Sequence, residues 1–130
     1  MWKIVLADDQ KSVRQGVRGW LEDEQGFKVV GEASDGAEAV EVTSRQKPDI
    51  LVTDLKMPRL NGIEVTKRVR ELSPDTRVII LSMYGNKVYV DAAFKAGAWG
   101  YVLKKFSTDG LTDAIRTVAG GRAYLSPSIS

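Results

Sequence analysis

The sequence predicts an α/β fold in which one parallel β-sheet is covered by helices on both faces. Five short runs are apolar, rich in β-branched residues and about 20 to 28 residues apart, as expected of strands that are buried on both faces. The segments between these runs place apolar residues at helical spacing. Strand and helix therefore alternate five times, which predicts right-handed crossovers and a doubly wound sandwich.

Five strands are predicted from runs that contain few charged residues. They comprise residues 2–7 (WKIVLA), 27–33 (FKVVGEA), 49–54 (DILVTD), 77–82 (RVIILS) and 99–104 (WGYVLK). None of these runs is long enough to compete as a helix, because helices are usually 10 residues or longer whereas buried strands are shorter, on the order of 4–8 residues.

Apolar stripes predict three of the helices that connect these strands. The stripes are Val13, Val17, Trp20 and Leu21; Val65, Val69 and Leu72; and Leu111, Ala114, Ile115 and Val118. Residues 35–46 predict an Ala-rich helix that opens with Asp-Gly, and residues 86–95 are a shorter and weaker helix candidate. Gly16 and Gly19 leave the exact extent of the first helix open, because glycine disfavours a helix interior.

The composition fits one globular domain with a substantial core. Of the 130 residues, 43% are hydrophobic and 28% are charged, and this length is near the common domain size. We predict a domain over residues 1–121 and the start of a linker over residues 122–130, because the ending GGRAYLSPSIS is rich in Gly and Ser.

Charge and hydropathy exclude several classes of partner. The 19 basic and 17 acidic residues are interspersed and sum to +2, so neither nucleic acid nor an anionic membrane is an expected partner of this segment. No apolar run approaches the length of a membrane span, and the N-terminus does not read as a signal peptide. We therefore expect a cytoplasmic protein.

The chain contains no cysteine and no histidine. The first absence excludes disulfides, thiolate nucleophiles and cysteine zinc sites. The second excludes a Ser-His-Asp triad, a histidine-ligated metal and a histidine base. Any chemistry must therefore use carboxylates, hydroxyls, lysines or the backbone.

Polar side chains follow four of the predicted strands. Asp8 and Asp9 follow the first strand, Asp54 ends the third, Ser82 ends the fourth and Lys104 ends the fifth. Ligands of such sheets bind at the carboxyl ends of the strands. These side chains are therefore expected to meet at one edge of the sheet.

Three clustered carboxylates need positive charge among them. Unit charges about 4 Å apart interact by roughly 4 kcal/mol at an effective dielectric constant near 20. Lys104 can supply one positive charge, and a divalent cation can supply two more. Ligation by carboxylates, a carbonyl and waters is what Mg²⁺ prefers, so we interpret the Asp-Asp pair at 8–9 as one direct ligand and one outer-sphere ligand, without assigning which is which.

Each of these residues also has an ordinary structural interpretation. Asp8 or Asp9 alone could cap the helix that follows. Asp54 could be a loop residue, Ser82 a strand-end hydroxyl and Lys104 a surface lysine. It is their joint placement at the ends of four strands that favours a functional site.

Four motifs match one protein family in order and in spacing: ADDQ (7–10), VTDLKMPRLNG (52–62), LS (81–82) and GYVLKK (100–105). With them the chain resembles the receiver domain of two-component response regulators over essentially its whole length. The ending AIRTVAGGRAYLSPSIS resembles receivers of the LuxR/NarL type. The resemblance implies a flavodoxin-like (CheY-like) sheet of five strands in the order 2-1-3-4-5, and a phosphoaspartate switch rather than an enzyme with a separate substrate.

The resemblance implies a phosphoacceptor and a Mg²⁺ site. Asp54 corresponds to the acceptor of the phosphoryl group. Mg²⁺ would be bound by the carboxylates of Asp9 and Asp54, by the backbone carbonyl of Lys56 and, through water, by Asp8. A carboxylate is already ionised at neutral pH, so the missing histidine is no obstacle to this chemistry.

The resemblance also implies a switch. Lys104 would bind one phosphoryl oxygen and Ser82 would hydrogen-bond another. Tyr101 is similar to the aromatic residue that turns inward when that hydroxyl moves. Pro58 and Gly62 correspond to residues that shape the loop after the acceptor and admit the next helix.

The resemblance implies three kinds of partner. The phosphoryl donor would be the phosphohistidine of a sensor histidine kinase. A homodimer would form on phosphorylation, either through the first and fifth helices or through the fourth helix with the fifth strand and helix, and the sequence does not choose between these faces. DNA would be bound only through a C-terminal helix-turn-helix domain outside these 130 residues, and no membrane partner is expected.

Some positions depart from the family pattern or vary within it. Ser82 stands where threonine is common, and the lysine at Lys105 replaces a frequent proline. A cis peptide bond between Lys104 and Lys105 would cost about 3–4 kcal/mol and is left open. Lys56 and Tyr84 lie two residues beyond the acceptor and the hydroxyl, so we hypothesise that they slow self-dephosphorylation. The alternative is that both simply lie on the surface.

Sequence features also bear on four other classes of function. A flavodoxin needs a Ser/Thr-rich phosphate loop where this chain has ADDQKSVRQ, and a dehalogenase-type phosphatase needs a second aspartate at the position of Lys56. The Walker A motif of P-loop NTPases is missing from the sequence. A pseudo-receiver that acts without phosphorylation stays the competing interpretation, and the complete set of site residues argues against it.

Overall fold

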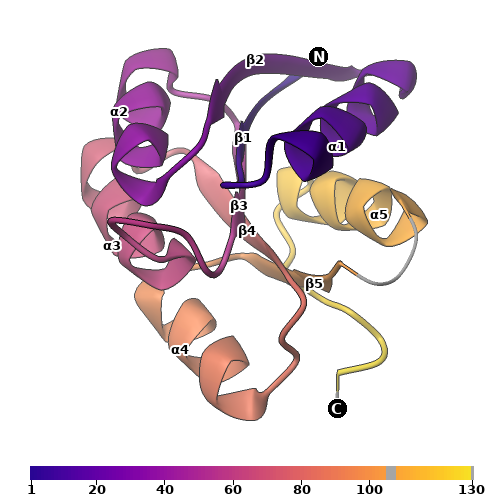
Figure 1. The fold of residues 1–130 in the computed structure, drawn as a ribbon. Helices are drawn as coiled ribbons and strands as arrows, with labels where there is room; N and C mark the ends of the chain where they lie inside the picture. The colour runs from indigo at the N-terminus through magenta and orange to yellow at the C-terminus, as the bar shows by residue number, and fades with distance from the viewer. Residues whose placement is uncertain (105–107, 130) are drawn as a thin grey trace.

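The structure alternates strands and helices as predicted (Figure 1). It is a computed structural model that describes residues 1–104 and 108–129. The elements in chain order are β1 (Trp2–Ala7), α1 (Lys11–Asp23), β2 (Phe27–Ala33), α2 (Gly36–Gln46), β3 (Ile50–Asp54), α3 (Gly62–Leu72), β4 (Arg77–Ser82), α4 (Lys87–Ala96), β5 (Gly100–Leu103), α5 (Thr108–Ala119) and β6 (Tyr124–Leu125). The peptide bond between Lys104 and Lys105 lies outside the described residues.

All strand pairs in the sheet are parallel, and the strand order is β2-β1-β3-β4-β5-β6. The prediction of the parallel sheet and of the order 2-1-3-4-5 for the first five strands is confirmed, but the prediction of five strands is wrong. Tyr124 and Leu125 form a sixth strand, paired with Gly100 and Tyr101 of β5. This strand lies in the segment that the sequence predicted as the start of a linker.

The sixth strand is stabilised by the free edge of β5. The amide of Tyr124 donates to the carbonyl of Trp99 at 2.9 Å, and the amide of Ser126 donates to that of Tyr101 at 3.0 Å. The Ser126 hydroxyl in turn accepts a hydrogen bond from the amide of Leu103 at 3.0 Å. A run of two residues has no periodicity of its own, so its strand depends on this edge.

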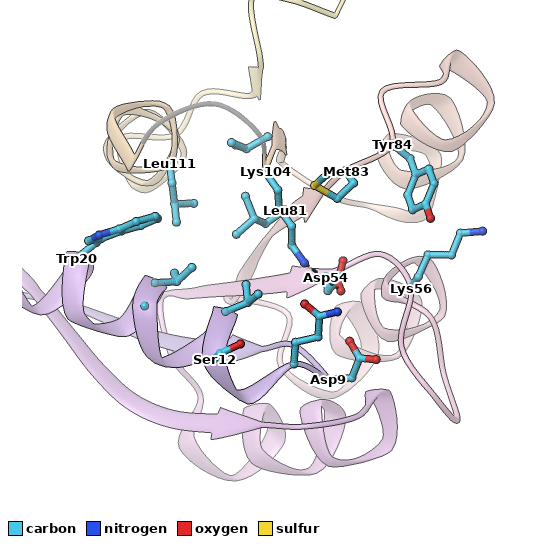
Figure 2. Close-up of a pocket in the computed structure, with 15 residues that line it drawn as sticks. Asp9, Ser12, Trp20, Asp54, Lys56, Leu81, Met83, Tyr84, Lys104 and Leu111 are labelled. Carbon is cyan, nitrogen blue, oxygen red and sulfur yellow. Dashed lines mark ion pairs between the residues drawn. The ribbon is translucent and has the colours of Figure 1, made fainter.

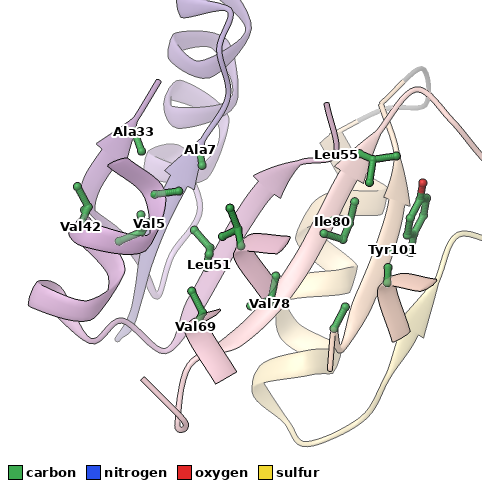
Figure 3. Packing of buried hydrophobic residues seen from close by; sticks show 14 of the residues in the cluster. Val5, Ala7, Ala33, Val42, Leu51, Leu55, Val69, Val78, Ile80 and Tyr101 are labelled. Atoms are coloured by element: carbon green, nitrogen blue, oxygen red, sulfur yellow. The ribbon is translucent and has the colours of Figure 1, made fainter. Parts of the chain in front are cut away.

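Two hydrophobic clusters pack on opposite faces of the sheet. Alternate strand residues point to opposite faces, so Val5 and Leu51 join one cluster and Ile4 and Ile50 the other. Figure 3 shows part of the first cluster, which helices α2, α3 and α4 cover. Helices α1 and α5 cover the second cluster. The sheet is therefore buried on both faces, which is why its strands lack polar alternation.

Side-chain hydrogen bonds cap the N-termini of helices α2 and α3. The predicted start of α2 is confirmed, because the Asp35 carboxylate accepts from the Glu38 amide at 2.8 Å. Helix α3 begins with a capping box in which Asn61 and Glu64 each accept from the other's backbone amide, at 2.9 and 3.0 Å. In the described part of the chain, no helix is long and apolar enough to cross a membrane.

Two glycines allow the loop after β3 to lie against its neighbours. A Cβ atom at Gly62 would lie 2.4 Å from the carbonyl oxygen of Asp54, and one at Gly36 would lie 2.0 Å from that of Leu60. The Gly36 amide also donates to the Pro58 carbonyl at 3.2 Å. The N-termini of α2 and α3 thus hold this loop from two sides.

Thr43→Val is expected to raise the free energy of unfolding by about 1 kcal/mol. The Thr43 hydroxyl is buried in α2 without a hydrogen-bond partner among the described residues, so a methyl group of the same size removes a desolvation cost. Urea unfolding of the variant measures the change.

Thr76→Val is the matched control. The buried Thr76 hydroxyl donates to the Pro48 carbonyl at 2.6 Å and lies 2.7 Å from the Ser73 hydroxyl. The same substitution there should lower the free energy of unfolding by about 1–3 kcal/mol. Loss of stability in Thr43→Val would show that the Thr43 hydroxyl is satisfied in solution.

Candidate functional site

Three carboxylates meet at the carboxyl ends of β1 and β3. These strands are neighbours, with Ala7 paired to Thr53, so the residues that follow them lie side by side. One oxygen from each of Asp8, Asp9 and Asp54 lies within 4.8 Å of the others. Asp8 is buried, Asp54 is partly buried and Asp9 is exposed. The structure thus brings together the three acids that the sequence placed at this edge.

Lys104 reaches the same edge from the end of β5. Its Nζ atom lies 2.8 Å from Oδ2 of Asp8 and 3.1 Å from Oδ2 of Asp54. Its backbone amide donates to the Ser82 carbonyl at 2.8 Å, which holds the end of β5 against β4. The lysine side chain is only 14% exposed, so it is an internal counter-ion rather than a surface lysine.

The surroundings of the site raise the pKa of both Asp54 and Lys104. Burial raises the pKa of the Asp54 carboxyl above its ordinary value, and the ion pair with Lys104 does not cancel this effect, to which the charge of Asp8 adds. Burial lowers the pKa of Lys104, but its hydrogen bond to Asp8 and the charges of both acids outweigh burial and raise it. Lys104 therefore stays charged, whereas the ionised form of Asp54 is costly.

The acids do not cap the helix that follows them. Helix α1 has Gln10 as its N-cap residue, without a side-chain cap. The Asp8 carboxylate instead accepts from the Gln10 amide at 2.9 Å. Arg14, one turn into α1, donates to the Asp8 carbonyl at 2.6 Å. Arg14 is not among the site residues that the sequence predicts, because nothing in a helical arginine indicates which backbone carbonyl it will meet.

One carboxylate oxygen of Asp54 accepts a backbone hydrogen bond, and the other forms an ion pair with Lys104. Oδ1 accepts from the Leu55 amide at 2.8 Å, and Oδ2 faces Lys104. The Asp54 carbonyl lies beneath Gly62, where any larger residue would collide with it. Asp54 is thus held at the end of β3 by its own backbone geometry and by Lys104.

Ser82 and Tyr101 lie next to the acids, but their hydroxyl groups are hydrogen-bonded to the backbone of Tyr84 in the loop that follows β4. The buried Ser82 hydroxyl accepts from the Tyr84 amide at 3.0 Å. Tyr101 is fully buried, and its hydroxyl donates to the Tyr84 carbonyl. Burial raises the pKa of Tyr101, so the phenol is protonated and acts as the donor. The predicted aromatic switch residue therefore lies inside the protein in this structure.

Lys56 extends away from the acids toward two tyrosines. Its Nζ atom lies 5.1 Å from the centroid of the Tyr84 ring, 5.0 Å from that of the Tyr89 ring and 3.2 Å from the Tyr89 hydroxyl. The two rings meet edge to face, 5.9 Å apart. The sequence indicates Lys56 and Tyr84 but not Tyr89, which the first turn of α4 places beside them.

A groove connects the acids to the surface between α1 and α5. It has a volume of about 750 Å³ and is lined at one end by Asp9, Asp54 and Lys104 (Figure 2). Its other end is lined by apolar side chains that include Trp20 and Leu111. Asp54 can therefore be reached from the surface through this groove.

Comparison with known proteins identifies the family. A model of the response regulator receiver domain matches residues 4–116. The transcriptional regulatory protein DegU of Brevibacillus brevis is 38% identical over 128 residues, which cover 98% of this chain and 54% of DegU. The oxygen regulatory protein NreC of Staphylococcus carnosus is 38% identical over 129 residues, covering 98% and 59% of the two chains. The chain thus spans a little over half the length of these relatives.

Solved structures agree with this assignment. A two-component response regulator of the LuxR family from Aurantimonas sp. SI85-9A1 is 38% identical, with a TM-score of 0.95 and coverage of 99% of this chain and 92% of that one. The signal receiver domain of NarL from Mycobacterium tuberculosis is 34% identical, with a TM-score of 0.89 and coverage of 93% and 98%. With the family model, the relatives and the fold in agreement, the chain belongs to the response regulator receiver domains, and within them to the LuxR/NarL type.

Proposed function

We propose that this chain is a phosphorylation switch in which Asp54 accepts a phosphoryl group from the phosphohistidine of a sensor histidine kinase. The observation that carries the proposal is the position of Asp54, which lies 3.1 Å from the Lys104 ammonium and in one cluster with Asp8 and Asp9. An ionised carboxylate needs no general base to act as a nucleophile. The groove beside α1 supplies the approach for a donor.

The proposed transfer is a displacement at phosphorus. An oxygen of the Asp54 carboxylate forms a bond to phosphorus while the phosphorus–nitrogen bond of the donor breaks, and the imidazole leaves with the electron pair. The product is a mixed anhydride on Asp54. Lys104 lies where it can hold a phosphoryl oxygen, which stabilises the charge in the transition state. The chain changes its own covalent state and turns over no separate substrate, so we do not class it as an ordinary enzyme.

The three acids fit a Mg²⁺ ion. They offer only oxygen atoms, which Mg²⁺ prefers, and they carry more negative charge than Lys104 balances. We propose that Asp9, Asp54 and the Lys56 carbonyl would bind the ion directly and Asp8 through water. When bound, the ion would supply positive charge to the phosphoryl oxygens and offset the repulsion between the phosphate and the acids.

The hydrogen bonds around Tyr84 support a switch at Ser82 and Tyr101. A phosphoryl group on Asp54 would attract the Ser82 hydroxyl, which now holds the Tyr84 amide. Tyr101 holds the carbonyl of the same residue. A displacement of Ser82 would therefore move the backbone of Tyr84, to which Tyr101 is also hydrogen-bonded. The result would be a changed surface around α4 and β5.

The output would lie in a part of the protein beyond this chain. The relatives are almost twice as long, and DegU is described as a transcriptional regulatory protein. A solved structure of RcsB, 27% identical to this chain, contains two dimers bound to two parallel DNAs. We propose by analogy that phosphorylation promotes dimerisation here and that an attached helix-turn-helix domain binds DNA.

Acetyl phosphate with Mg²⁺ is expected to add one phosphoryl group to the protein, as measured by intact mass. EDTA should prevent the gain because the acids then lack their cation. Asp54→Asn should abolish it, whereas Asp75→Asn, an exposed acid after α3, should leave it unchanged. No gain under any condition would favour the pseudo-receiver, and a gain that persists in Asp54→Asn would place the acceptor elsewhere.

Asp54→Asn is expected to unfold at a higher temperature than the unmodified protein at pH 7 in EDTA. The folded-state pKa of Asp54 lies above its ordinary value, so this carboxyl stabilises the fold only while protonated, and that contribution is lost as the pH rises through the folded pKa. The advantage of asparagine should therefore shrink between about pH 7 and about pH 3. Melting curves across this range test it, with Asp75→Asn as control, and a less stable variant at pH 7 would mean that the Lys104 ion pair outweighs burial.

We further propose that Lys56 and Tyr84 shield the phosphoryl group from water. Both line the groove that leads to Asp54, and the Lys56 ammonium lies 5.1 Å from the centroid of the Tyr84 ring, so the two side chains would narrow the approach of water to Asp54. Lys56→Ala with Tyr84→Ala should shorten the lifetime of phosphorylated Asp54 several-fold, measured by the decay of the phosphorylated mass after removal of donor. Lys87→Ala changes a lysine that pairs with Asp91 on α4 and should have no effect. An unaltered lifetime in the double variant would leave both residues as ordinary surface side chains.

A further inference from the structure

We propose that Arg14 is a positioning residue that holds the connection between β1 and α1 in the shape a divalent cation requires. The part that concerns the cation rests on the function proposed above. Arg14 donates from Nη1 to the Asp8 carbonyl at 2.6 Å and from Nε to Oε1 of Glu32 at 2.8 Å. Its side chain is 13% exposed, so the guanidinium is fixed inside this corner of the molecule.

The connection, residues 8–10, has to turn both of its acids toward one edge. Asp8 is tied to β2 through its amide, which donates to the Ala33 carbonyl at 3.1 Å, and its carboxylate accepts from the Gln10 amide at 2.9 Å. Helix α1 has no side-chain cap that could hold its first turn. Arg14 therefore joins α1, β2 and the connection through two hydrogen bonds from one planar guanidinium, one to the Asp8 carbonyl and one to Glu32.

Glu32 anchors the guanidinium from the other side. Burial raises the pKa of the Glu32 carboxyl, but its bonds to Arg18 and Arg14 outweigh burial and lower it, so the anchor is charged. Arg14 also lines the small void beneath Asp8 and Asp54. The Arg14 charge therefore lies close to Asp8 and Asp54, and its hydrogen bond to the Asp8 carbonyl acts on the connection that carries Asp8 and Asp9.

Charge and geometry act in opposite directions at this position. The positive charge of Arg14 repels a bound cation, so removing it would strengthen binding, whereas losing the hydrogen bond to Asp8 would weaken it. Arg14→Lys separates the two effects, because lysine keeps the positive charge but lacks the planar guanidinium that donates to both the Asp8 carbonyl and Glu32. Supporting groups around metal ligands contribute roughly tenfold or more to affinity, so the geometric effect is expected to dominate in this variant.

Arg18 provides the matched control. It lies one turn further along α1 and binds the second oxygen of Glu32 and, at 3.1 Å, Glu22. Its hydrogen bonds in the described part of the chain do not include the 8–10 connection. Arg18→Lys thus perturbs the same anchor without touching the Asp8 carbonyl.

The experiment measures Mg²⁺ binding by titration calorimetry on the whole 130-residue chain and its two lysine variants. Arg14→Lys should weaken Mg²⁺ binding by about tenfold and Arg18→Lys by less than about twofold, with similar urea unfolding curves for both in EDTA. Equal affinity in Arg14→Lys and the parent chain overturns the proposal. So does an equal loss of affinity in both variants, since Arg14 would then act only through the general stability of α1.

A second measurement separates this proposal from the proposed function. Amide hydrogen exchange in EDTA should be faster at Gln10 in Arg14→Lys than in Arg18→Lys, because the former frees the connection whether or not an ion binds. Faster exchange at Gln10 in a protein that binds no Mg²⁺ would refute the proposed cation site yet retain Arg14 as the residue that positions the connection. Unchanged exchange refutes the positioning role itself.

Discussion

The electrostatic neutralisation of three neighbouring carboxylates is the constraint on which the rest of the site depends. Their oxygens lie within 4.8 Å of one another, and two of the three acids are buried or nearly so, where water screens repulsion poorly. Lys104 relieves part of this repulsion, and it comes from β5, which lies two strands away from β3 in the sheet. One ammonium group thus joins the ends of these strands, and the three acids carry more negative charge than this one lysine balances.

The topology of the sheet places the ends of β1 and β3 side by side. The chain passes from β1 to one edge at β2 and then returns to continue from β3 toward the other edge. The loops after β1 and β3 therefore leave the sheet in opposite directions, and the space between them opens at their carboxyl ends. Gly62 and Gly36 let the loop after β3 approach its neighbours closely, so the backbone that follows Asp54 packs directly against the N-termini of α2 and α3.

The site is linked to the surface by a short polar path. Tyr84 is held at its amide by Ser82 and at its carbonyl by Tyr101, and its ring contacts Lys56. Tyr84 therefore connects residues near Asp54, in the loop after β4 and on β5. The charge that the proposed phosphorylation would add at Asp54 would act through this path on a surface that a partner can recognise.

Local patterns in the sequence determined five strands, five helices and the side chains that meet at their ends, because apolar periodicity and strand-end position depend only on neighbouring residues. The tertiary structure alone decided the sixth strand, since Tyr124 and Leu125 need the free edge of β5. It also decided that Arg14 holds the Asp8 carbonyl and that Tyr101 lies inward. These features are contacts between specific atoms of side chains and backbone that only the folded chain brings together, and no periodicity in the sequence encodes them.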